Sequence, residues 1–132
     1  MLKKIHHVGI VVRSIEAAYA FYRDTLSLSV HKEDIIQDQG VKAALLTIGP
    51  SEIELLEPIT PGTGVARFLD HRGEGLHHVC FETDNVHREL AVAKARGLAV
   101  IDQQPRPGLA GLICFLHPRS SHGVLIEYAQ PQ

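Results

Sequence analysis

The chain has 132 residues, which fits one domain or two very small modules that share a core. Hydrophobic residues make up 45% and charged residues 21% of it, a composition that excludes a disordered protein. The formal net charge of −2 offers no basic surplus, so we expect no nucleic-acid partner. No apolar run is long enough to cross a membrane, and the start of the chain lacks a signal-like apolar stretch, so we expect a cytoplasmic protein.

The first half of the chain predicts a strand, a helix and three further strands. Residues 5–12 read IHHVGIVV, and Ser14 is a good helix N-cap before SIEAAYAFYRDTL, where apolar residues recur at helical spacing. Turn residues separate the strand signals that follow. These signals cover Ser29–Gln37, Val41–Ile48 and Glu52–Ile59. A connecting segment, residues 61–73, contains a short predicted helix closed by Gly73.

The second half repeats this order. Residues 76–83 read LHHVCFET, Asn85 is the next candidate N-cap, and Gly97 suits the position just after the helix. Three strand signals follow, at Leu98–Gln104, Leu112–His117 and Gly123–Ala129. The fold class predicted is therefore α+β, with two tandem βαβββ modules whose helices cover the outer face of a sheet. We expect one domain, residues 1–132, made of modules of about 1–60 and 74–132.

Two histidines and two glutamates recur at matched places in this repeat. His7 and His78 are 71 positions apart, and Glu54 and Glu127 are 73 positions apart. One histidine or one glutamate in a strand is more often structural, but two residue types repeated together favour a shared site. Two copies of one layout would bring all four side chains to one point. Imidazole nitrogen and carboxylate oxygen suit a divalent ion such as Co²⁺, Ni²⁺, Fe²⁺ or Zn²⁺.

The neighbouring histidines, His6 and His77, receive a different interpretation. Because side chains alternate along a strand, both are expected on the face opposite the four candidate ligands. We therefore interpret His6 and His77 as structural residues.

Several stretches resemble a known group of proteins. IHHVGIVV and FYRDTL are similar to the opening of the vicinal oxygen chelate, or glyoxalase, superfamily. RGEGLHHVCFET and FLHPRSSHGVLIEY resemble the methylmalonyl-CoA epimerase family more specifically, and the resemblance runs from Ile5 to about Gln130. It implies a half-open, barrel-like sheet around a divalent metal, Co²⁺ first and Zn²⁺, Ni²⁺ or Mn²⁺ as alternatives. It also implies a homodimer and an acyl-CoA substrate.

The resemblance implies the ligand set His7, Glu54, His78 and Glu127, and an epimerase that interconverts (R)- and (S)-methylmalonyl-CoA through an enolate. Glu54 and Glu127 are then the candidate catalytic residues, one for each face of the α-carbon. One departure concerns Ala43, which stands where some epimerases carry a glutamate. Those proteins have glutamine at the place of Glu54.

Other functions stay open at this point. A lactoylglutathione lyase, or glyoxalase I-type isomerase, uses the same metal and enolate chemistry, and a non-catalytic metal-dependent binding protein is a further alternative. An Fe²⁺ dioxygenase is less favoured because two histidines and one carboxylate suffice for it. CoA phosphates would need cationic partners. The candidates are Lys3, Lys4, Lys42, Arg106 and Arg119. The Pro105–Gly111 and Pro118–Gly123 loops are candidate substrate-gripping loops.

Overall fold

The structure, a computed structural model, describes residues 1–132 and contains three α-helices and eight strands. The strands are β1 (Leu2–Val11), β2 (Ser29–Ile36), β3 (Val41–Ile48), β4 (Ser51–Pro58), β5 (Gly75–Thr83), β6 (Arg106–Gly108), β7 (Gly111–Leu116) and β8 (Ile126–Gln130). The helices are α1 (Ile15–Tyr19), α2 (Gly64–Arg72) and α3 (Val86–Ala95), and α1 continues as a π-helical turn (Ala20–Thr25). The α+β class and the two βαβββ modules are confirmed. No helix is long and apolar enough to span a membrane.

The chain forms two compact units. The central unit comprises Val8–His77, and the terminal unit comprises Met1–His7 together with His78–Gln132. Strands β1 and β5 each contribute residues to both units. The arrangement of the chain as a single domain stays a prediction.

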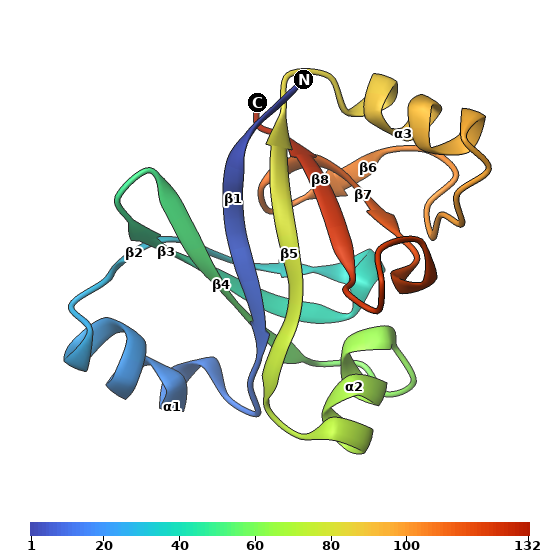
Figure 1. Cartoon of the computed structure of the whole chain (residues 1–132). Helices are drawn as coiled ribbons and strands as arrows, with labels where there is room; N and C mark the ends of the chain where they lie inside the picture. Colours follow the sequence, from blue (N-terminus) through green and yellow to red (C-terminus); the bar gives the residue numbers. More distant parts are fainter. The chain divides into compact units, whose positions relative to one another are not determined.

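In the central unit, α1 covers one face of an antiparallel sheet that includes β2, β3 and β4 (Figure 1). Ser14 caps this helix, since its side chain accepts a hydrogen bond from the backbone N–H of Ala17 at 3.1 Å. Ile15 and Tyr19 of α1 pack against the sheet. Their buried partners are Val12, Ala44, Leu46 and Leu55. Because side chains alternate along β4, Glu54 lies on the face away from α1.

In the terminal unit, the strand order is β5-β8-β7-β6, with β5 and β8 parallel and the other pairs antiparallel. Helix α3 covers one face of this sheet, where Val86 and Leu90 pack around Cys114 (Figure 1). The opposite face carries a second buried cluster. Its members are Cys80, Ala110, Ile113, Phe115 and Ala129.

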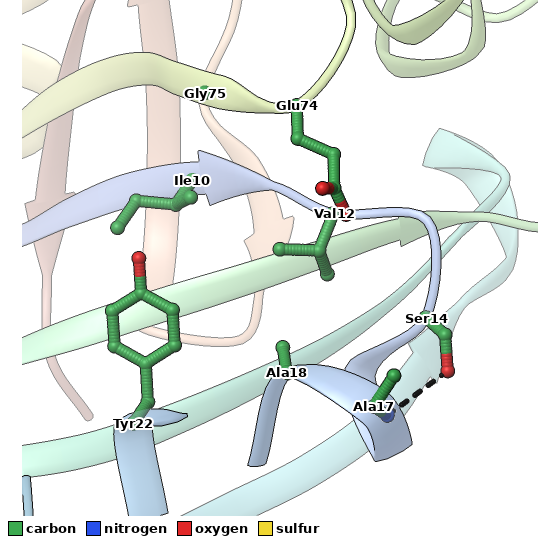
Figure 2. Close-up of a pocket in the computed structure, with 8 residues that line it drawn as sticks. All are labelled: Ile10, Val12, Ser14, Ala17, Ala18, Tyr22, Glu74 and Gly75. Carbon is green, nitrogen blue, oxygen red and sulfur yellow. Dashed lines mark hydrogen bonds between the residues drawn. The ribbon is translucent and has the colours of Figure 1, made fainter. Parts of the chain in front are cut away.

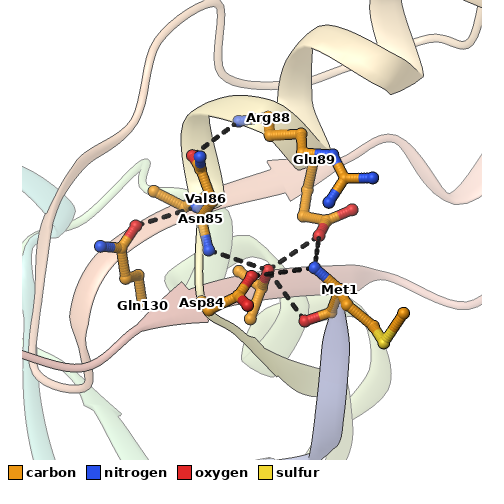
Figure 3. A network of polar contacts seen from close by, with 8 residues as sticks. Met1, Asp84, Asn85, Val86, Arg88, Glu89 and Gln130 are labelled. Carbon is orange, nitrogen blue, oxygen red and sulfur yellow. Dashed lines mark hydrogen bonds and ion pairs between the residues drawn. The ribbon is translucent and has the colours of Figure 1, made fainter.

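The start of α3 is tied to both ends of the terminal unit (Figure 3). The side chain of Asn85 accepts from the backbone N–H of Arg88 at 3.0 Å, which confirms the predicted cap. The N–H of Val86 donates to the Gln130 side chain at 2.9 Å, so the last strand holds the helix N-terminus. The remaining members of the network are Met1, Thr83, Asp84 and Glu89.

One strand prediction in the second module is wrong, and the predicted start of another is too early. Leu98–Gln104 is not a strand, and only Val100 forms an isolated bridge there. The Asp102 carboxylate accepts the N–H of Phe115 at 2.8 Å, so a side chain replaces part of the ladder that a regular strand would need. The strand forms instead at Arg106–Gly108, at the edge of the sheet, where proline is tolerated.

The last strand begins at Ile126, three residues later than predicted. His122 and Gly123 have φ values of 60° and 92°, and two successive residues in this left-handed region interrupt a regular strand. The predicted start of this strand is therefore part of a turn.

Candidate metal centre

Three of the four predicted ligands meet in the terminal unit. Nε2 of His7 lies 3.0 Å and Nε2 of His78 lies 2.9 Å from Oε1 of Glu127. The two Nε2 atoms are 3.1 Å apart. The exposed fractions of His7, His78 and Glu127 are 0%, 3% and 4%, so the group is closed to bulk water.

Strand pairing places these side chains on one face of the terminal sheet. In the parallel β5–β8 pair, Cys80 lies opposite Glu127, and His78 shares the face of Cys80 because it is two residues away. Across β7, Phe115 is the partner of Glu127. The Phe115 ring lies edge-on to the His78 ring, with the centroids 5.4 Å apart. The cluster is therefore set in the apolar side of the sheet, away from α3.

The backbone beside Phe115 is held by a partly buried carboxylate that the sequence did not indicate. One oxygen of Asp102 accepts the N–H of Phe115 at 2.8 Å, and the other accepts Nε of Arg106, also at 2.8 Å. Only the Phe115 bond fixes β7 next to His78. An aspartate in a segment that reads as a strand gives no sequence signal for this role.

The charge of Glu127 is set by opposing effects. Burial raises the pKa of its carboxyl group, but the two adjacent imidazoles outweigh burial and bring the pKa well below its ordinary value. Glu127 is therefore ionised at neutral pH. Its Oε1 atom is nevertheless buried without a hydrogen-bond partner, although two imidazole nitrogens lie within 3.0 Å of it.

This pattern fits a cation better than a set of hydrogen bonds. Two imidazole nitrogens and one carboxylate oxygen converge on one another, and the oxygen has no hydrogen-bond partner although both nitrogens lie within 3.0 Å of it. A buried polar atom without a partner is costly, and a positive ion would remove that cost. His7, His78 and Glu127 thus form a buried cluster whose chemistry suits a divalent metal ion.

The fourth predicted ligand, Glu54, belongs to the central unit. It lies in β4 opposite Leu45 of β3 and has an exposed fraction of 7%. Glu54 and Glu127 share one feature, because each lies on the sheet face away from the helix of its own module. The role of Glu54 as a ligand stays a prediction. Ala43 is buried in β3 opposite Leu56.

His6, interpreted from the sequence as a structural residue, contacts one of the candidate ligands. Its exposed fraction is 8%, and its Nδ1 atom lies 2.8 Å from Nδ1 of His7. Strand alternation predicted the direction of the two side chains but not the reach of two adjacent imidazole rings. His77, its counterpart in the repeat, is half-buried and packs against the ring of Phe68 at 5.1 Å.

The candidate CoA-binding cations mostly have acidic partners of their own. Lys4 lies 3.8 Å from Glu82, and Lys42 lies 3.7 Å from Glu33. Arg106, bound to Asp102, begins a β6–β7 hairpin within the Pro105–Gly111 segment. None of these pairs identifies a phosphate site.

A separate pocket of about 390 Å³ opens in the central unit (Figure 2). Its lining is mainly apolar, with the hydroxyl of Tyr22 and the carboxylate of Glu74 at its edges. The full lining is Ile10, Val12, Ser14, Ala17, Ala18, Tyr22, Glu74 and Gly75. Because it adjoins α1, it lies on the sheet side opposite to Glu54 and contains none of the predicted ligands.

Residues 6–115 match the family model described as the Glyoxalase/Bleomycin resistance protein/Dioxygenase superfamily. The chain belongs to this superfamily. The superfamily indicated by the sequence motifs is thereby confirmed.

Similar proteins cover nearly the whole chain. YqjC of Bacillus subtilis, an uncharacterised protein, is 34% identical over 99% of this chain and 94% of its own length. The ethylmalonyl-CoA/methylmalonyl-CoA epimerase of Cereibacter sphaeroides is 35% identical over 98% of this chain and 99% of its own. A variant of the Streptomyces coelicolor methylmalonyl-CoA epimerase, solved in complex with 2-nitronate-propionyl-CoA, is 36% identical over 99% of both chains, with a TM-score of 0.95.

Proposed function

We propose that this protein is a divalent-metal-dependent epimerase that interconverts (R)- and (S)-methylmalonyl-CoA. The observation that carries the proposal is the buried cluster of His7, His78 and Glu127, in a chain that resembles epimerases from end to end. The Cereibacter sphaeroides relative is an epimerase of ethylmalonyl-CoA and methylmalonyl-CoA. A substrate of this class supplies an acidic C–H between a thioester and a carboxylate.

His7, His78 and Glu127 would hold the ion, with Glu54 as the fourth ligand. Glu54 is equivalent to Glu127 in the repeat and is buried on the corresponding face of its own sheet, which supports this role. A bound divalent ion supplies positive charge that stabilises the negative oxygen of an enolate. Co²⁺ is the proposed ion, and Zn²⁺, Ni²⁺ or Mn²⁺ would offer the same type of charge.

The two glutamates would move the α-proton. Epimerisation removes this proton from one face of the carbon and returns a proton to the other face, so a base is needed on each side. Glu127 is ionised at neutral pH and can accept a proton, although its lowered pKa makes it a weak base while the imidazoles contact it. We therefore propose that substrate binding loosens Glu127 from these contacts and restores its basicity.

The test is proton NMR of methylmalonyl-CoA in D₂O with Co²⁺-loaded protein. We expect catalytic loss of the α-proton signal, and EDTA should stop this loss. Persistence of the signal at saturating metal would overturn the epimerase proposal. A glutathione hemithioacetal, the substrate class of the glyoxalase I-type alternative, would be the next compound to assay, since the same three ligands serve both reactions.

A further inference from the structure

The imidazole of His6 makes a contact that the proposed chemistry does not use. Nδ1 of His6 lies 2.8 Å from Nδ1 of His7, and the two rings meet edge to face, with their centroids 5.0 Å apart at an interplanar angle of 85°. Both residues are buried, with exposed fractions of 8% and 0%. Two nitrogens at this distance inside a protein share a proton, so one ring donates and the other accepts.

The opposite side of His7 decides the direction of this hydrogen bond. Nε2 of His7 faces Glu127 and His78 at 3.0 Å and 3.1 Å, and a metal ligand must present a lone pair at that atom. A neutral His7 then carries its proton on Nδ1 and donates it to Nδ1 of His6. If His6 donated instead, the proton of His7 would lie on Nε2 and point into the cluster.

We propose that His6 is a positioning residue that fixes the tautomer and ring orientation of His7 and thereby raises the metal affinity of the cluster. The inference rests on the metal site of the proposed function. Histidines that bind metals usually donate their second N–H to a carboxylate, a backbone carbonyl or water, and loss of such a partner costs about 10- to 100-fold in affinity. Here a neighbouring imidazole in the same strand provides the acceptor.

The repeat supplies a matched control. His77 precedes His78 as His6 precedes His7, but His77 is half-buried and packs against Phe68. Removal of the His77 imidazole therefore removes a packed histidine beside a candidate ligand without removing the acceptor of His7. Comparison of substitutions at His6 and His77 therefore distinguishes loss of the hydrogen bond to His7 from the general effect of losing a histidine beside a ligand.

The experiment measures Zn²⁺ affinity by competition with a chromophoric chelator, for wild type, His6→Leu, His6→Asn and His77→Leu. Oδ1 of asparagine is the same number of bonds from Cα as Nδ1 of histidine, so His6→Asn keeps an acceptor, whereas leucine offers none. We expect His6→Leu to bind Zn²⁺ about 10- to 100-fold more weakly. His6→Asn and His77→Leu should stay within about threefold of wild type, well below that loss.

A second measurement needs no variant. Nitrogen-15 NMR of the Zn²⁺-loaded wild type should show the proton of His7 on Nδ1 and that of His6 on Nε2. The reverse tautomer of His6 would overturn the inference, as would wild-type affinity in His6→Leu or equal losses in His6→Leu and His6→Asn.

A rival arrangement has a distinct signature. The ligand atoms of His6, His7 and Cys80 lie within 4.8 Å of one another, so these residues could hold a second ion. Two bound Zn²⁺ per chain, with one lost in His6→Leu, would make His6 a ligand and overturn its positioning role. Failure of the wild type to bind any Zn²⁺ would instead overturn the metal site itself, and with it the proposed function.

Discussion

The two histidine pairs occupy equivalent places in β1 and β5, but their first members have different surroundings. His6 is buried and contacts the imidazole of His7, whereas His77 is half-buried and packs against the ring of Phe68. The second members, His7 and His78, both direct Nε2 at the same oxygen of a glutamate. The repeat thus preserves the candidate ligands and lets the residues that support them diverge.

The hydrogen bonds at the starts of α1 and α3 are also similar in position but different in their acceptors. In the central unit, the N–H of Ile15 donates to the carboxylate of Glu57 at 2.8 Å. In the terminal unit, the N–H of Val86 donates to the amide oxygen of Gln130 at 2.9 Å. Each module therefore anchors the start of its helix with a side chain from its last strand, but one acceptor is charged and the other is neutral. Paired substitutions can measure how far the two modules are equivalent.

The largest expected effect concerns the two glutamates. Glu127→Gln should lower exchange of the α-proton of one enantiomer of methylmalonyl-CoA at least about a hundredfold, because the amide cannot act as a base. Glu54→Gln should do the same for the other enantiomer, and each variant should abolish inversion, because each glutamate is proposed to serve one face. Proton NMR in D₂O with separate (R) and (S) substrates measures exchange and inversion. Exchange of both enantiomers at the wild-type rate in Glu127→Gln would exclude it as a base.

The repeat also made it possible to predict several features of the fold and of the candidate metal site from the sequence. The caps at Ser14 and Asn85 were predictable because the hydrogen-bonding side chain immediately precedes an apolar helical pattern. His7 and His78 could be proposed as ligands because they recur at one offset. These signals are local or periodic, so a single sequence contains them.

The features that escaped prediction depend on contacts between distant or irregular segments. Asp102 holds Phe115 from thirteen residues away, and its segment reads as a strand by hydrophobicity alone. The contact of His6 with His7 depends on ring orientation, which strand alternation does not specify. Prolines at 105 and 107 favoured a loop where the protein places an edge strand. Composition and spacing carry no information about these choices.

The next largest effect is the loss of stability when a crowded glycine of each unit is replaced by alanine. A Cβ atom at Gly111 would lie 2.3 Å from the backbone oxygen of Gln130, and at Gly40 it would lie 2.7 Å from the side-chain methyl of Thr63. Backbone cannot rotate away as a methyl group can, so Gly111→Ala should cost about 2–4 kcal/mol of unfolding free energy. Gly40→Ala should cost less, about 1–2 kcal/mol.

Urea unfolding of both variants measures this difference. Gly49→Ala is the matched control for Gly40→Ala, because Gly49 has a similar φ, 57° against 64°, and a Cβ atom there would have no neighbour within 4 Å. It reports the cost of the backbone conformation alone. A Gly111→Ala variant no less stable than Gly49→Ala would show that β8 moves aside at no cost.

A smaller effect is the loss of folding stability at alkaline pH, to which Cys114 beneath α3 and Tyr19 in α1 contribute at different pH values. Burial raises the pKa of Cys114 beneath α3 from 9.0 to about 12, and burial, together with Glu33, also raises the pKa of Tyr19 in α1. Above pH 9 the unfolded chain loses the thiol proton that the folded chain keeps, so stability falls as pH rises toward 12. Tyrosine ionises in the unfolded chain only near pH 10, so Cys114 acts first.

Urea unfolding of metal-free protein between pH 8 and pH 10 tests this order. Wild type should lose about 1 kcal/mol more than Cys114→Ala over this interval, since one proton per molecule corresponds to about 1.4 kcal/mol per pH unit. Parallel curves for the two proteins would place the Cys114 titration in the folded state close to that in the unfolded chain.

The smallest expected effect is the change in stability when the side chains that accept the first N–H of each helix, Glu57 and Gln130, are substituted. Glu57→Gln should lower the free energy of unfolding by about 0.5–1 kcal/mol, because a charged acceptor is stronger and favours a helix N-terminus. The converse change, Gln130→Glu, should gain almost nothing, since Asp84 and Glu89 already place negative charge at the start of α3 (Figure 3). Urea unfolding at low and high salt separates the cases, because salt should screen the repulsion and make Gln130→Glu more favourable. Equal and opposite effects of the two substitutions would mean that the anchors are interchangeable and that their surroundings do not matter.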